Sequence, residues 1–177
     1  MQTRPFPSPT GLFTGSIAGV IEMIAASETF RGLVGAASAE EAKASRIHWP
    51  VANDRRDDDD QMLCPRPRAI VNPANRLTWD QGGTRSWADN GNCFVSFEFL
   101  PSPECLGNRE DEMAEFLERT EKIVREMADL AGLDLPDGSA TYLNVQRFNL
   151  VNGPGECERQ NNNDELYYGV TFELSWL

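Results

Sequence analysis

Four consecutive aspartates, Asp57, Asp58, Asp59 and Asp60, are the densest group of potential metal ligands in the sequence. Hard cations such as Ca²⁺ and Mg²⁺ bind where several carboxylate oxygens converge. Consecutive side chains point in alternating directions, however, and this run lacks the interleaved glycine and the distal acidic residue of a dedicated calcium loop. We therefore interpret residues 53–61, NDRRDDDDQ, as a solvated charged loop that is available for contacts with a partner.

The remaining candidates for catalysis are few. His48 is the single histidine, and neither a serine nor a cysteine lies beside it in the sequence to act as its nucleophile. The glycine-containing stretches 81–83 and 153–156 lack the Lys-Ser/Thr pair of a phosphate-binding loop. We expect no enzyme and no cofactor. A small metal-dependent enzyme remains an alternative, and it requires the aspartate run to meet Glu98, Glu173 or His48 in the fold.

Cysteine and tryptophan predict packing rather than chemistry. The cysteines occur singly, without the spacing of a zinc site, and we expect reduced thiols that pack as small hydrophobic groups: Cys64, Cys93, Cys105 and Cys157. Trp79 and Trp87 lie on a turn-rich stretch and fit an interface as well as a core. Trp176 continues the apolar phase of the last strand, which favours the core.

The charge balance excludes one class of function. With 28 acidic and 16 basic residues, the formal net charge is −12. Proteins hold nucleic acid largely by neutralising phosphates with Lys and Arg, so we expect no specific DNA binding. An acidic protein surface does suit a channel wall past which DNA must slide without sticking. No run approaches the roughly 18 apolar residues of a membrane span. Glu22 interrupts the apolar residues 12–25, so we expect no export signal and no membrane partner.

Helical periodicity predicts three helices. Residues 1–15 are rich in proline and read as an extended N-terminal arm, followed by an amphipathic helix over 16–34 with Ser16 as its N-cap. Ser38 and Glu41 have the spacing of a capping box that opens a short second helix. The longest apolar stripe lies within residues 108–131, and acidic residues crowd its first turn, where the helix dipole favours them.

Period-two alternation predicts four strands. A proline-bounded strand covers 66–71, a second ends in FEFLP, and a third over 141–151 changes phase in a way that indicates a bulge. Residues 72–90 read as a turn-rich insert. The final stretch, ELYYGVTFELSWL, alternates without an error and leaves one thin polar face, formed by Thr171, Glu173 and Ser175.

Pairs of strands separated by a helix favour an antiparallel sheet over a parallel one. We therefore predict an α+β fold, a two-layer sandwich whose mainly antiparallel four-stranded sheet has helices packed on one face. Residues 16–177 form one domain with charged loop insertions at 53–61 and 152–164, and residues 1–15 form the arm.

This order of elements resembles the tail terminator (tail completion) proteins of long-tailed bacteriophages and related minor tail or neck proteins. The resemblance spans residues 16–177 and rests on the first helix with Phe30 near its end, the PRAIV strand, the FEFLP strand, the long charged helix and the closing YYGVTFELSW. It departs from the family in the insert 72–90 and in the proline-rich arm.

The resemblance implies a structural virion protein that forms a homo-oligomeric ring, a hexamer, on the end of the tail tube. Such a ring halts tube growth and performs head-tail joining, so its partners are the tail tube protein and the head-neck connector protein, and DNA passes through its lumen. The implied location is the virion tail or neck, after assembly in the host cytoplasm. Another connector or tube-associated protein and a monomeric cytosolic adaptor domain remain alternatives.

Overall fold

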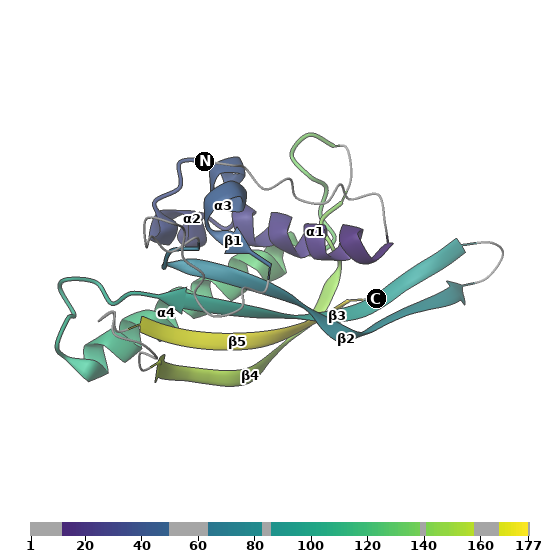
Figure 1. Ribbon diagram of the computed structural model, residues 1–177. Coiled ribbons are helices and arrows are strands. Elements are labelled where there is room, and N and C mark those ends of the chain that lie inside the picture. Colours follow the sequence, from purple (N-terminus) through teal and green to yellow (C-terminus); the bar gives the residue numbers. More distant parts are fainter. Residues whose placement is uncertain (1–11, 50–63, 83–85, 139–140, 158–166, 177) are drawn as a thin grey trace, which may run out of the picture.

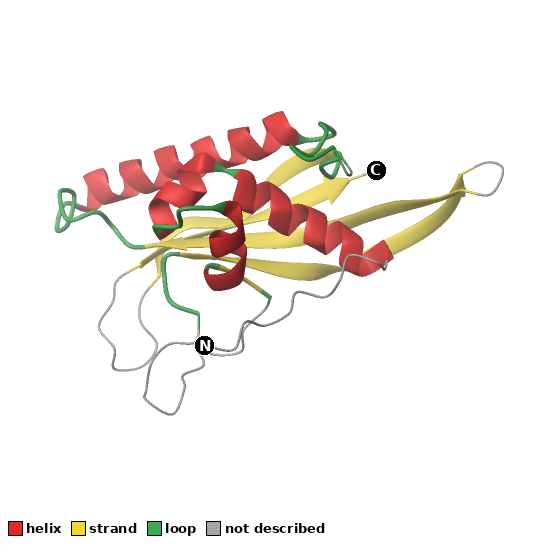
Figure 2. Cartoon of the chain, turned by 90° about the horizontal axis from the view of Figure 1, so that it is seen from above, coloured by secondary structure: helices red, strands yellow, loops and turns green. Residues whose placement is uncertain are grey.

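The computed structural model separates into a helical layer and a sheet layer (Figure 1). It describes residues 12–49, 64–82, 86–138, 141–157 and 167–176, with side chains for all of these except 12–16, 73–90 and 154–157. Seen from above, the helices lie on one face of the sheet (Figure 2). The predicted α+β fold is confirmed.

The sheet has five strands in the order β1-β2-β3-β5-β4. All neighbours are antiparallel except β1 and β2, which are parallel with Ile47 opposite Ala69. The predicted count of four is therefore short by one, because a two-residue strand carries no periodic signal. The strands are β1 (Ile47–His48), β2 (Arg68–Gly82), β3 (Ser86–Phe99), β4 (Val145–Cys157) and β5 (Tyr167–Trp176).

The turn-rich reading of residues 72–90 is wrong. β2 and β3 run on through this segment as a hairpin, with Leu77 opposite Gly91 and Gly82 opposite Ser86. A register shift between Pro73 and Leu77 absorbs the proline, which cannot donate a ladder hydrogen bond. Cross-strand pairing has overridden the local preference of Asn and Gly for turns.

The helices are α1 (Leu12–Ala26), α2 (Glu28–Val34), α3 (Ala39–Ser45) and α4 (Arg109–Leu130). α1 begins four residues before the predicted N-cap Ser16, so the predicted arm is wrong for residues 12–15, while 1–11 lie outside the described residues. At α3 the Ser38 hydroxyl accepts from the Glu41 amide, which confirms the predicted N-terminal half of the capping box, but the Glu41 carboxylate accepts from the Ala37 amide instead of that of Ser38. At α4, Asn108 is the N-cap.

The single helix predicted over 16–34 is divided at Ser27. The extended backbone of Ser27 ends α1, and its hydroxyl accepts a hydrogen bond from the Phe30 amide at 3.0 Å, which caps α2. Glu126 of α4 fixes this junction, because it accepts hydrogen bonds from the hydroxyls of Ser27 and Thr29 at 2.6 and 2.5 Å. A residue that lies far away in the sequence therefore adds to the local cap at this division.

A continuous row of aromatic rings joins the two layers. Ring centroids lie 5.6–6.2 Å apart from one member to the next. Such contacts are worth about 0.5–1.5 kcal/mol each beyond burial. The row runs from α2 through β3 to α4 and β5, in the order Phe30, Phe97, Phe99, Phe116 and Tyr168. It explains why α4 lies over β3 and β5.

Candidate functional site

The candidate site is the face of the sheet turned away from the helices. On β5, Tyr168, Val170, Leu174 and Trp176 are buried beneath the helices, as the alternation predicted. The intervening Thr171, Glu173 and Ser175 belong to the opposite face and are half-buried. The four described helices leave this face uncovered (Figures 1 and 2).

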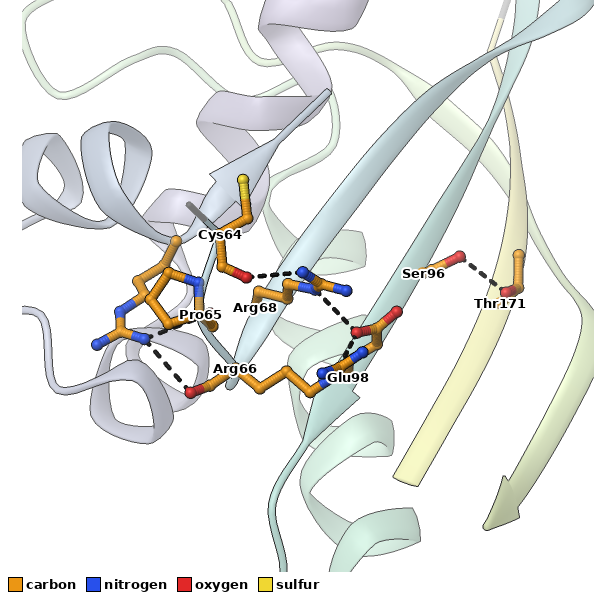
Figure 3. Close-up of polar contacts among 8 residues, drawn as sticks. Cys64, Pro65, Arg66, Arg68, Ser96, Glu98 and Thr171 are labelled. Carbon is orange, nitrogen blue, oxygen red and sulfur yellow. Dashed lines mark hydrogen bonds and ion pairs between the residues drawn. The ribbon is translucent and has the colours of Figure 1, made fainter. Parts of the chain in front are cut away.

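Polar side chains on this face pair across β3 and β5. The hydroxyls of Ser96 and Thr171 lie 2.8 Å apart and face one another in Figure 3. Asn92 donates its side-chain N–H to the Glu173 carboxylate at 2.5 Å. These cross-strand pairs fix the positions of Thr171 and Glu173, so the face presents an ordered polar row beside the half-buried Phe94 and Ile70.

An arginine-carboxylate cluster occupies one end of the same face (Figure 3). Arg66 and Arg68 each donate Nε–H to the same oxygen of Glu98, with N–O distances of 2.8 Å. Arg68 also donates to the Cys64 carbonyl at 2.6 Å, and the Arg66 guanidinium lies 3.7 Å from the centre of the Tyr167 ring. The cluster joins the 64–67 loop, β2, β3 and β5.

Burial makes this cluster rigid rather than reactive. The side chains of Arg68 and Arg66 are only 3 % and 5 % exposed, and that of Glu98 is 15 % exposed. A guanidinium does not lose its proton in proteins, so neither arginine can act as a general acid. A buried ion pair is costly to break, because removal of one partner leaves a desolvated charge.

Of the other predicted contact residues, Trp79 and Trp87 lie within the described structure. Asp57, Asp58, Asp59 and Asp60 lie outside the described residues. Trp79 and Trp87 lie in the extended hairpin, opposite Asp89 and Gln81 in the register, and the structure describes only their backbone. The meeting of the aspartate run with Glu98, Glu173 or His48 therefore stays a prediction.

Sequence reasoning missed the arginine cluster. The sequence does indicate that Glu98 belongs to the polar face, because Glu98 and Ser96 are two residues apart in the same strand. What the sequence could not supply was the pairing of β2 with β3, which places Arg68 directly opposite Glu98.

A second polar site lies on the helical side, in a shallow pocket between α4 and the end of β3. Glu112, only 2 % exposed, accepts hydrogen bonds from the Tyr168 hydroxyl at 2.5 Å and the Gly107 amide at 2.6 Å. These two bonds hold the pKa of the Glu112 carboxyl below its ordinary value against the effect of burial. The carboxylate is therefore ionised and satisfied, which makes it a structural anchor rather than a proton donor.

Cys93 behaves as the sequence predicts. It is fully buried in β3, and burial raises the pKa of its thiol to about 12, so the thiol is protonated and unreactive. Among the described residues, no group of three or more His, Cys, Asp or Glu side chains is arranged to hold a metal ion. No helix in the described part of the chain is long and apolar enough to cross a membrane.

No family model matches the sequence, and no curated protein is significantly similar to it.

Proposed function

We propose that this protein is a structural subunit that assembles into a ring, in the role of a tail terminator of a long-tailed bacteriophage. The observation that carries the proposal is the ordered polar face of the sheet, in which Thr171 and Glu173 are held by hydrogen bonds to Ser96 and Asn92. A fixed polar surface without a reactive group suits a contact or a channel wall better than catalysis.

In this proposal the face that carries Thr171, Glu173 and Ser175 lines the lumen of a hexameric ring or abuts a neighbouring subunit. The net charge of −12 suits a bore through which DNA slides, because sticking requires Lys and Arg to displace counterions from phosphates. The ring caps the tail tube and meets the head-neck connector, as in the family that the sequence resembles.

The ring itself is tested by negative-stain electron microscopy together with native mass spectrometry across a concentration series. Closed rings, with six copies as the expected number, support the proposal. Tube capping is tested by adding the protein to a polymerising tail tube protein and measuring tube lengths. Tubes that grow equally long with and without the protein contradict the terminator role.

The position of the polar face is tested by charge reversal. Glu173→Lys places a positive charge on that face, whereas the matched control Asp129→Lys places it on the exposed side of α4, in the helical layer. We expect assembled rings of the Glu173 variant, and not of the control, to retain double-stranded DNA at low salt and to release it as salt rises. Equal retention by both variants means that the face does not line the bore.

A further inference from the structure

The hairpin of β2 and β3 is longer than the sheet that carries it. β5 pairs with β3 only as far as Gly91, opposite Trp176, and β1 pairs with β2 only at Ala69 and Ile70. Residues 77–82 and 86–90 continue beyond these points as a two-stranded ribbon, which Figures 1 and 2 both show running past the ends of β4 and β5.

Both outer edges of the ribbon are unpaired within the described structure. Its register is regular from Leu77 opposite Gly91 to Gly82 opposite Ser86, with no bulge in between. Every second residue of each strand therefore directs its backbone N–H and C=O groups away from the partner strand. A two-stranded ribbon is only marginally stable by itself, and a regular bare edge is a template for another strand.

The edge formed by β4 differs sharply from the ribbon. β4 has three register shifts against β5, Gly153 has a positive φ of 82°, and Pro154 has no N–H to donate. Bulges and prolines are the features by which natural sheets prevent pairing at an edge. The fold thus protects the β4 edge and leaves the ribbon edges open.

We propose that the ribbon pairs with the ribbon of a second copy of this chain. The outer edge of β3 in one copy lies antiparallel to the outer edge of β2 in the next. If β3 paired with β3 of a second copy, only one edge of each ribbon would be covered. If β3 of each copy pairs with β2 of the next copy around a closed ring, both edges of every ribbon are covered. The inference rests on the self-association proposed above but not on a role in phage tails.

Hydrogen exchange measured by mass spectrometry tests this pairing in the full chain, at concentrations below and above self-association. We expect amides in residues 77–82 and 86–90 to exchange at least tenfold more slowly in the oligomer, and amides at the β4 edge to be unchanged. A chain that stays monomeric at every concentration, or an oligomer whose ribbon amides exchange as in the monomer, overturns the proposal.

A deletion variant provides the second test. Residues 78–90 are replaced by an Asn-Gly turn, which favours a tight hairpin and closes on the existing Leu77–Gly91 pair, and far-ultraviolet circular dichroism checks that the body folds. We expect this variant to be monomeric, and the control Leu150→Lys/Val151→Lys, at exposed positions of β4, to associate like the parent. A folded deletion variant that still forms the parental oligomer refutes the ribbon pairing. Rings that form through the ribbon but do not cap tubes refute only the terminator role.

Discussion

The contact of Glu126 with the start of α2 leads to a quantitative prediction. One carboxylate oxygen accepts from the Ser27 hydroxyl at 2.6 Å and the Thr29 amide at 3.0 Å, and the other accepts from the Thr29 hydroxyl at 2.5 Å. Hydrogen bonds to a charged group contribute about 1.5–3 kcal/mol each to stability, and water can replace part of this contribution at a half-buried site. Glu126→Ala should therefore lower the unfolding free energy by about 2–4 kcal/mol. Glu126→Gln, which keeps the shape, should cost about 1–2 kcal/mol.

The same contact gives stability a defined pH dependence. Burial raises the pKa of Glu126, but the hydrogen bonds from Ser27 and Thr29 together lower it by more, so the folded-state pKa lies below the ordinary value. The unfolded chain then binds more protons between the two pKa values. The contribution of Glu126 is fully present above its unfolded pKa of about 4.3 and is lost as pH falls through the lower folded pKa.

Urea denaturation followed by circular dichroism, from pH 7 to pH 3, measures this effect. The difference in unfolding free energy between the parent and Glu126→Gln should be constant above about pH 5 and shrink below it. Glu118→Gln, an exposed position on the same helix, is the control and should change little. A cost for Glu126→Ala below about 0.5 kcal/mol, or a difference that is independent of pH, would refute the reasoning.

Two further substitutions test the other buried charges. Tyr168→Phe removes one donor from the buried Glu112 carboxylate and should lower the unfolding free energy by about 1–3 kcal/mol, whereas an unchanged urea midpoint contradicts the anchoring role. Glu98→Gln removes the shared negative charge beside Arg66 and Arg68 and should lower the unfolding free energy by about 3–5 kcal/mol. Hydrogen exchange should become faster in β2, which locates the damage. A loss of stability without faster exchange in β2 argues against the role of the cluster.

Strong local periodicity explains what the sequence predicted well. α4 has an apolar stripe and a cap, and the structure buries Phe116, Ile123 and Met127 of that stripe. β5 alternates without error and is buried on the predicted face. The predicted bulge near Val145 is also present, as a register shift between Val145 and Arg147. In each case the information lies within a short window of sequence.

What the sequence did not predict depends on distant residues. The junction between α1 and α2 is also held by Glu126, which is 99 residues from Ser27. The ribbon contains the turn residues Gly and Asn, and it became a hairpin only because β2 and β3 pair through it. The arginine cluster likewise exists only once Arg68 lies opposite Glu98.

The position of β5 within the sheet has a consequence for biosynthesis. β5 is the last of the five strands to leave the ribosome, yet it lies between β3 and β4, and it is the only described strand that joins them. The β2–β3 hairpin can form early, whereas β4 has no partner among the described strands until β5 has been made. Slow, non-local closure of this kind leaves apolar surface exposed in the nascent chain. A chain truncated before β5 therefore cannot join β4 to the rest of the described sheet.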